Sequence, residues 1–430
     1  MELDSTVRSW EEDMKNRQRK LYVGIDVHSR EHKAAVLPIA LLEQPGAPWR
    51  KVKPLSIKNN IADFERLDTT IKSHVSNAEE VAIAVDHTGG HYSEPIAYFL
   101  QARGYTVYHL EAKAMKAARE RFLDEENKSD VIDSTSVAYM LYLRDAHGLS
   151  FRISAMTPEL GSGAAALNSL VLQRWQFTKL ATQATNRLHQ LLLAVFPEGE
   201  ARHFNQLLKV TPYYPTPKDI LDSNRLEGIE KLSQKHKENI LELAANSIGI
   251  PGDIYQWLIK DLSIQRVESL TKRDALTAIL RQRVAAHPYG DILLSFPSLG
   301  EVAAATIIGI IKDIENWPDK KKFKRALGVY SYLTQSGGSS GRTKQGREGS
   351  RHGRRVLFQV CFRCIRTNAH DNDFKDYYLR QVAQGKLRIK ALVSTMGKLA
   401  EIIYHCLKVG EPYQYQGKYK TIVISSDKKS

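Results

Sequence analysis

Aspartate side chains from separate parts of the chain could together hold divalent cations. Asp26 lies in LYVGIDVHS, a short apolar stretch rich in β-formers, and Asp86 ends a second such stretch, EVAIAVD. A carboxylate inside an apolar strand is costly to bury unless it is paired or binds a metal. If these two strands are neighbours in one sheet, the two carboxylates meet at one point.

A third acidic element follows in NKSDVIDSTSVAYML. Asp130 and Asp133 are three residues apart, so in a helix they share one face, and they stand in its first turn, where negative charge is favoured. Four converging carboxylates can hold two divalent cations, Mg²⁺ or Mn²⁺, in a geometry suited to phosphoryl transfer. Taken singly, Asp130 also fits an N-cap, Asp133 a solvated helix position and Asp86 a strand-end turn.

A glycine-rich basic stretch, LTQSGGSSGRTKQGREGSRHGRRVL, is the second candidate for chemistry. Its glycines let the backbone approach a phosphate closely, and its cations would neutralise neighbouring phosphates. Ser336, just before two glycines, is a hydroxyl that could serve as a nucleophile. The residues alone favour the alternative, a flexible basic loop that binds DNA without chemistry. We predict nucleic-acid contacts from Arg342, Lys344, Arg347, Arg351, Arg354 and Arg355.

The four aspartates lie in a segment that is predicted to form an α/β domain with a mixed sheet. The reason is that strands in a meander are followed there by strands alternating with helices. The patterns predict strands at 21–29, 31–40, 49–57, 80–87 and 105–111, and helices at 60–75, at 94–104 and, after the last of these strands, to about residue 147. Residues 160–290 are almost wholly helical in pattern, which favours a coiled-coil-like arm for self-association over an ordinary helical bundle. The last third is predicted to be mainly helical.

These patterns divide the chain into five parts. They are a polar leader (1–20), the α/β domain (21–155), the helical arm (156–290), a C-terminal domain bearing Ser336 (291–415) and a tail (416–430).

The composition narrows the classes of partner. The formal net charge of +14 favours polyanions, nucleic acid before acidic membrane, although a basic protein without such a partner is the alternative. No stretch approaches the ~18 apolar residues of a membrane span, and the charged first twenty residues are unlike a secretory signal. The C-x-x-C pair, Cys361 and Cys364, lacks a second ligand pair and favours packing over zinc binding. We expect a reduced cytoplasmic protein associated with the nucleoid.

Several stretches resemble a known family when taken in their order along the chain. They are LYVGIDVHS, EVAIAVDHTGGHYSEP, NKSDVIDS, NRLHQLLLAVFPE, FPSLGEVAAATIIGII, KFKRALGVYSYLTQSGGSSGRTKQGREGSRHGRRVL and STMGKLAEIIYHCLKVGEPY. Together, over about residues 20 to 415, they are similar to insertion-sequence transposases that have a RuvC-like "DEDD" N-terminal domain and a C-terminal serine domain, relatives of the Piv-type DNA invertases.

This resemblance implies a ribonuclease-H-like N-terminal domain that binds magnesium through Asp26, Asp86, Asp130 and Asp133. It implies that Ser336 is the nucleophile and forms a covalent link to DNA during strand exchange between donor and target. It also implies a homo-oligomer, a tetramer, guided by a structured bridge RNA encoded beside the gene. Two positions depart from the family pattern: Asp86 stands where Glu is usual, and Ser134 where Ala is common.

Two rival functions stay open from the sequence. One is a metal-dependent nuclease of the RuvC type, in which Ser336 only contacts phosphate. The other is a nucleic-acid-binding relative without catalytic activity, which the shorter Asp86 side chain keeps open.

Overall fold

The computed structural model describes most of the chain. The described ranges are 19–87, 91–111, 130–149, 153–156, 158–223, 226–334, 342–346, 348–366 and 368–417. The chain forms two compact units, one of residues 1–166, 308–354 and 396–409, the other of residues 167–307, 355–395 and 410–430. None of the described helices is both long and apolar enough to cross a bilayer.

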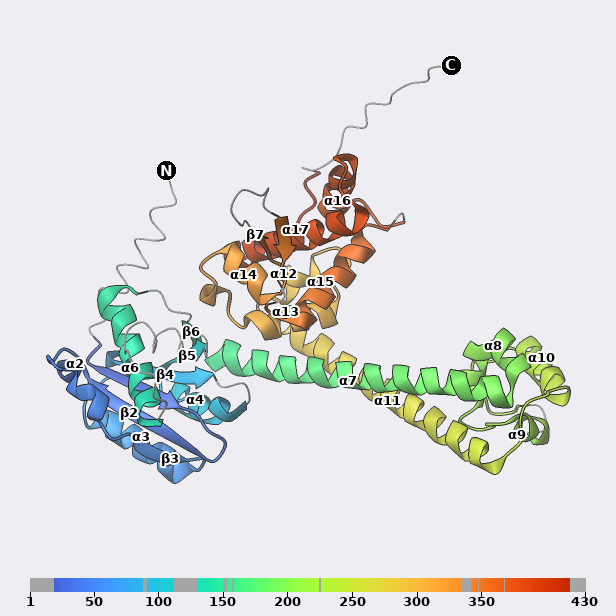
Figure 1. The fold of residues 1–430 in the computed structure, drawn as a ribbon, viewed down its shortest axis with the longest axis horizontal. Helices are drawn as coiled ribbons and strands as arrows, with labels where there is room; N and C mark the ends of the chain where they lie inside the picture. The colour runs from blue at the N-terminus through green and yellow to red at the C-terminus, as the bar shows by residue number, and fades with distance from the viewer. Residues whose placement is uncertain are drawn as a thin grey trace, which may run out of the picture. The chain divides into compact units, whose positions relative to one another are not determined.

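The N-terminal region is built on a six-stranded mixed sheet with the order β3-β2-β1-β4-β5-β6 (Figure 1). Its strands are β1 (Leu21–Asp26), β2 (Glu31–Pro38), β3 (Leu55–Lys58), β4 (Val81–His87), β5 (Thr106–Glu111) and β6 (Ile153–Met156). β4 is parallel to β1 and to β5, whereas the other neighbours are antiparallel. The helical segments of this region are α2 (Ile39–Leu42), η1 (Pro48–Lys51), α3 (Ile61–Lys72), η2 (Ala78–Glu80), η3 (His91–Ser93), α4 (Glu94–Gln101) and α6 (Asp130–His147).

Alternation along the central strands gives the sheet two different faces. Val23 and Ile25 of β1 join Ile83 and Val85 of β4 in one buried cluster, which also contains side chains of α3 and α4. On the opposite face Tyr22 of β1 and the small residues Ala82 and Ala84 of β4 lie in a second buried cluster with side chains of α6. Successive side chains of a strand point to opposite faces, so the even-numbered residues of β1 and β4 lie on the α6 side.

Gly24 lets α6 approach the sheet closely. A Cβ atom at this position would lie 2.1 Å from the carbonyl oxygen of Ser134 and 2.4 Å from the amide nitrogen of Ala138, both backbone atoms of α6. Any larger residue would therefore force the helix away from the strand. The register of α6 on β1 depends on this glycine.

We predict that Gly24→Ala lowers the free energy of unfolding by about 3 kcal/mol, because backbone atoms of α6 cannot move aside as a flexible side chain would. Urea denaturation checks this. Gly397→Ala is the matched control: its Cβ would meet only the flexible end of Lys324, at 3.7 Å, and Ala is the better helix former by about 1 kcal/mol. A Gly24→Ala protein as stable as wild type would show that α6 does not pack on β1 in this way.

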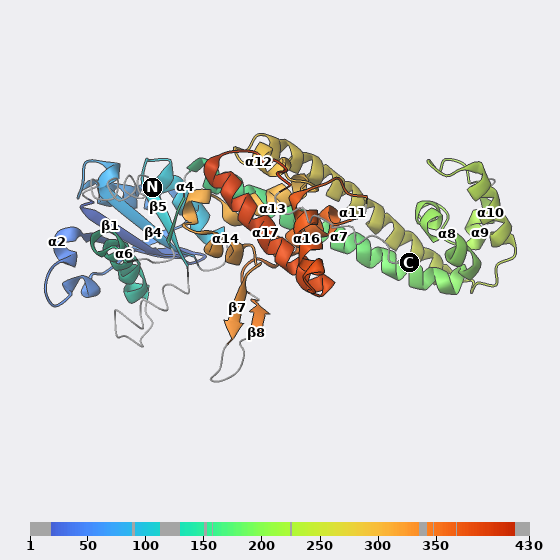
Figure 2. The same ribbon diagram turned by 90° about the horizontal axis from the view of Figure 1, so that it is seen from above.

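Two long helices of the second unit form an antiparallel pair (Figure 2). They are α7 (Pro158–Val195) and α11 (Asp253–Ala285). Arg174 Nε donates to Thr277 Oγ1 at 2.8 Å, and Arg266 Nε donates to Thr185 Oγ1 at 3.1 Å. Residue numbers rise along one helix as they fall along the other, so the predicted helical content of this segment is confirmed; its role as a coiled-coil-like arm stays a prediction.

Three shorter helices pack where α7 ends and α11 begins. They are α8 (Pro197–Val210), α9 (Pro217–Asp222) and α10 (Gln234–Ala245). Phe196, Leu207 and Ile240 lie in their common buried cluster, together with Leu188 of α7 and Ile259 of α11. The end of the arm therefore has a hydrophobic core of its own.

The C-terminal third is mainly helical, as predicted. Its elements are α12 (Gly290–Leu294), α13 (Glu301–Ile311), η5 (Ile314–Asn316), α14 (Lys320–Ala326), β7 (Ser331–Thr334), β8 (Arg342–Gln345), α15 (Arg351–Cys364), α16 (Asp373–Ala383) and α17 (Arg388–Val409). β7 and β8 pair antiparallel. The basic stretch expected to be a loop instead begins in β7, contains β8 and ends in the first two turns of α15.

In the N-terminal region two predicted strands have other bounds in the structure, and one strand was missed. The strand at 31–40 ends at Pro38, where α2 begins, and the segment at 49–57 is strand only from Leu55. Trp49 instead stacks on Tyr139 of α6 with ring centroids 4.2 Å apart. The sixth strand, β6, was not predicted; it pairs antiparallel with β5.

Candidate functional site

Asp26 and Asp86 lie at corresponding positions on adjacent parallel strands. The paired register of β1 and β4 runs to Ile25 opposite Val85, and each aspartate is the next residue on its strand. Both are buried, with 4% and 9% of their surface exposed. Alternation places both on the face that α6 covers. The condition set by the sequence, that these strands be neighbours in one sheet, is confirmed.

Asp133 reaches the same region from α6. It is 6% exposed, and the residue after it, Ser134, has its carbonyl oxygen against Gly24, two residues before Asp26. Asp133 is therefore buried, not solvated as one interpretation of the sequence held. Asp130 begins α6, but its side chain lies outside the described residues.

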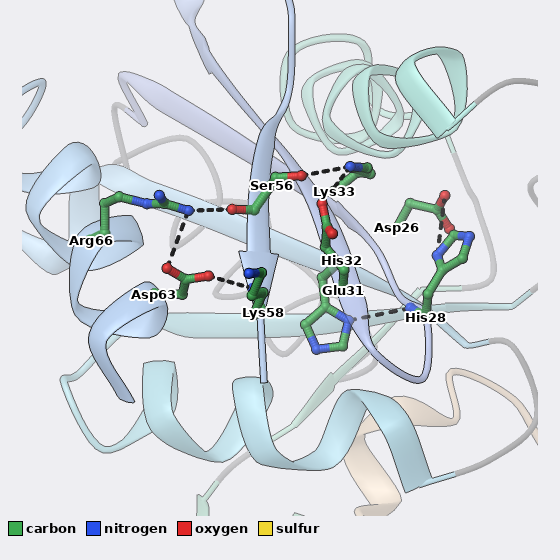
Figure 3. Close-up of polar contacts among 9 residues, drawn as sticks. All are labelled: Asp26, His28, Glu31, His32, Lys33, Ser56, Lys58, Asp63 and Arg66. Carbon is green, nitrogen blue, oxygen red and sulfur yellow. Dashed lines mark hydrogen bonds and ion pairs between the residues drawn. The ribbon is translucent and has the colours of Figure 1, made fainter. Parts of the chain in front are cut away.

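The turn after β1 brings a histidine to the same place. His28 Nδ1 lies 3.8 Å from Asp26 Oδ2, and its ring is about half exposed (Figure 3). The sequence analysis missed this residue. Its signal was the spacing D-x-H directly after an apolar strand, which puts both side chains at one sheet edge.

A buried histidine holds that turn in shape. His32 is fully buried; its Nδ1 accepts from the backbone N–H of His28 at 3.2 Å (Figure 3), and its Nε2 contacts Asn59 Oδ1 at 2.7 Å. Asn59 in turn donates to the carbonyl oxygen of Ser29 at 3.0 Å. Burial lowers the pKa of His32, although the Asn59 contact opposes the shift. A neutral ring fits this arrangement, because Nδ1 must accept and Nε2 must donate.

Neighbouring polar contacts fix β2 and β3 beside this turn (Figure 3). Lys33 Nζ donates to Ser56 Oγ at 2.6 Å, and the backbone N–H of Lys58 donates to Asp63 Oδ2 at 2.7 Å. Arg66 of α3 contacts both Asp63 and the carbonyl oxygen of Ser56. These contacts connect β3 to β2 on one side and to α3 on the other.

The donor chemistry of the carboxylates suits a hard divalent cation. Mg²⁺ and Mn²⁺ take carboxylate oxygens as ligands; Asp26 and Asp86 are buried at the ends of β1 and β4, and Asp133 is buried on α6, which covers the same face of the sheet. Within the described ranges, no three His, Cys, Asp or Glu side chains form a group that could hold a metal ion. The residues present fit such an ion by chemical type, and Asp130 is the fourth carboxylate that the sequence predicts.

The predicted nucleic-acid contacts in the C-terminal third differ in their surroundings. Arg354 Nε donates to the carbonyl oxygen of Gly328 at 2.8 Å, so this side chain holds the chain before β7. Arg355 is exposed, with its guanidinium over the ring of Trp175 at 4.1 Å, and Arg351 is exposed at the start of α15. Arg342 and Lys344 lie on β8, but their side chains are not described. Ser336 and Arg347 lie outside the described residues.

The two cysteines of the C-x-x-C pair lie on the buried side of α15. Cys364 Sγ contacts the carbonyl oxygen of Pro297 at 3.2 Å. Burial raises the pKa of Cys361 well above its ordinary value and that of Cys364 to about 11. Both are therefore thiols at neutral pH and pack as small apolar side chains.

Comparison with known proteins decides the family. Residues 23–197 match a family model for DEDD-type IS110 transposases, and residues 290–379 match the model of the IS116/IS110/IS902 transposase family. The chain belongs to the IS110/IS116 family of transposases. The first match contains all four predicted carboxylates, and the second contains Ser336.

Two relatives of this transposase come from insertion elements of Streptomyces. The 43.6 kDa protein of insertion element IS110 from Streptomyces coelicolor is 24% identical over 348 residues, which are 78% of this chain and 83% of the relative. The 44.8 kDa protein of insertion element IS116 from Streptomyces clavuligerus is 22% identical over 413 residues, or 92% and 96%. The likeness extends across both family matches and the arm between them.

Membership of this family indicates the general class of activity. A transposase acts on DNA, which it cleaves and recombines, and a DEDD domain suggests the use of divalent metal. The mixed sheet is compatible with a ribonuclease-H-like fold.

Proposed function

We propose that this transposase moves an insertion sequence by strand exchange, with divalent cations at Asp26, Asp86, Asp130 and Asp133 and a covalent intermediate on Ser336. The observation that supports it most is the adjacency of Asp26 and Asp86 on parallel strands beneath α6. Burying several carboxylates together is unfavourable without a positive charge to offset them.

In this proposal the carboxylates bind the divalent cations, and the serine hydroxyl attacks the DNA phosphate. A divalent cation supplies charge stabilisation at the attacking and leaving oxygens of phosphoryl transfer. The buried aspartates hold their positions through the β1–β4 register and the close packing of α6 on Gly24. The half-exposed His28 stands with Nδ1 3.8 Å from the Asp26 carboxylate.

The serine step conserves the phosphodiester. Ser336 Oγ bonds to phosphorus, the bond from phosphorus to the sugar oxygen of one strand breaks, and that oxygen takes up a proton. A hydroxyl of the second strand then attacks the phosphoserine, and Ser336 regains its proton. Residues 334–346, around Ser336, offer cations and no Asp, Glu or His that could act as a base, so we place activation of the hydroxyl at the aspartate site.

The partners in this proposal are donor and target DNA, a structured guide RNA and further copies of the chain. The net charge of +14 supports a nucleic-acid partner, and the resemblance noted from the sequence supports the RNA and a tetramer.

The experiment that tests the proposal is a strand-exchange reaction with purified protein, its co-purifying RNA and DNA carrying the element's ends. We expect joined products with Mg²⁺ or Mn²⁺ and none with EDTA. Hydrolysed ends without joining would favour the RuvC-type nuclease instead. Binding without any cleavage, unchanged by EDTA, would favour the non-catalytic relative.

A further inference from the structure

Helix α15 carries aromatic side chains on its solvent side that the proposed chemistry does not use. Its buried face contains Val356, Leu357, Val360, Cys361 and Cys364, at the spacing of an amphipathic helix. The opposite face exposes phenylalanines at 358 and 362, with 38% and 47% of their surface accessible. Large aromatic side chains exposed in pairs are typical of interaction surfaces.

The two rings lie together as one aromatic surface. The centroids of Phe358 and Phe362 are 6.1 Å apart and their planes differ by 7°. Arg366 lies one turn further along, with its guanidinium 5.6 Å from the ring of Phe362. Arg355 stands one turn before Phe358 and covers the ring of Trp175 on α7. Arg355, Phe358 and Phe362 therefore form a stripe along the exposed face of α15, and Arg366 continues it two residues beyond the end of the helix; we call these four residues the α15 stripe.

The segment of the sequence that forms this stripe carries charges of one sign. From Ser350 to His370 the sequence holds five arginines and neither Asp nor Glu. Within the described part of the chain, no carboxylate forms an ion pair with Arg355, Arg363 or Arg366. A second copy of the chain docking symmetrically here would bring arginines against arginines, which is unfavourable. A polyanion with flat apolar faces matches the stripe better.

We propose that the α15 stripe binds unpaired DNA, with bases stacked on Phe358 and Phe362 and phosphates near Arg355, Arg363 and Arg366. Stacking on aromatic side chains needs base faces that are free, which a duplex keeps covered. The inference rests on the DNA substrates of the proposed function, because strand exchange must unpair DNA before it is rejoined. It adds a binding surface to that function and assigns none of the chemistry.

The test uses the full-length protein in EDTA, so that binding is measured without strand exchange and a failure of the proposed chemistry leaves the result interpretable. The probes are a twelve-nucleotide DNA strand with a central 2-aminopurine, the same sequence as a duplex, and the same sequence as RNA. Fluorescence anisotropy gives affinity, and quenching of 2-aminopurine reports stacking.

The decisive variant is Phe358→Leu with Phe362→Leu, which keeps apolar bulk and removes the rings. We expect single-strand affinity to fall about tenfold or more, quenching to disappear and duplex affinity to stay within about twofold. Phe358→Tyr with Phe362→Tyr should retain binding and quenching. Leu379→Ala, which removes a comparably exposed apolar side chain of α16, should change neither.

A second variant separates the phosphate contacts from stacking. The slope of log affinity against log salt is negative for nucleic-acid binding. Replacing Arg355, Arg363 and Arg366 with Gln should make this slope less steep by about 2 for the single strand, whereas the leucine variant should keep the wild-type slope. Circular dichroism checks that each variant is folded; if the double variant is not, Phe362→Leu alone replaces it.

Three results would overturn the inference. They are single-strand affinity and quenching that persist in the leucine variant, tighter binding of the RNA strand than of the DNA strand, and a leucine variant that changes the oligomeric state in light scattering while binding DNA as before. The last result would identify the stripe as a contact between copies.

Discussion

Replacing Asp26 with Asn should lower strand exchange by a factor on the order of a thousand or more, because the substitution keeps shape and removes the charge that holds a cation. The same loss is expected for Asp133→Asn, whose carboxylate is also buried and whose neighbour Ser134 packs with its backbone against Gly24. Asp86→Glu, which restores the residue usual in the family, should keep at least part of the activity. Product formation on a gel, at saturating magnesium, measures each effect.

The aspartate variants should lose activity without losing stability. Removing one of several clustered carboxylates relieves repulsion, so in EDTA the free energy of unfolding of Asp26→Asn should equal or exceed that of wild type. A loss of activity together with a loss of stability would point to a structural role for Asp26 instead.

Asp68→Asn is the matched control for a buried aspartate outside the site. Asp68 of α3 accepts from the Tyr105 hydroxyl at 2.7 Å and pairs with Lys72 at 2.8 Å. Asp68→Asn should lower stability by about 1–3 kcal/mol and leave strand exchange near wild type at a temperature where the protein is folded. If Asp68→Asn were as inactive as Asp26→Asn, burial alone would explain the effect.

Ser336→Ala should abolish the covalent protein–DNA adduct while DNA binding stays within about twofold, because the Arg and Lys contacts that dominate affinity are untouched. In wild type with magnesium, stalled reactions should contain an adduct that survives boiling in detergent, and mass spectrometry should place the DNA on Ser336. The aspartate variants should also lose the adduct, since activation of the hydroxyl depends on their site.

The same stretch offers its own controls for the serine. Ser339 and Ser340 stand three and four residues after Ser336 in QSGGSSG, and their replacement with Ala should leave the adduct intact. An adduct that persists in Ser336→Ala would move the nucleophile to another residue. Free cleaved ends with no adduct, equal in wild type and Ser336→Ala, would establish a nuclease.

The buried strands and the helices of the core were predictable because their hydrophobic patterns are local. LYVGID and VAIAVDH are continuous apolar runs, and both became central strands of the sheet. The periodic residues 160–290 became the long helices of the arm and the short helices at its end. By contrast, the four residues of β6 carry too short a pattern, and only pairing with β5 makes them a strand.

The sequence by itself determined which residues could do chemistry, because aspartates within apolar strands and a serine among glycines and arginines are unusual in type and spacing. Only the tertiary structure decided that Asp26 and Asp86 meet. Their strands are separated in sequence by β2, β3 and α3, and parallel pairing between distant segments has no local signature. The position of Asp133 depends on Gly24, whose missing side chain has meaning only once a helix backbone lies against it. The aromatic stripe of α15 became visible for the same reason: burial of one helix face is a property of the packed molecule, and it alone shows which side chains are left for a partner.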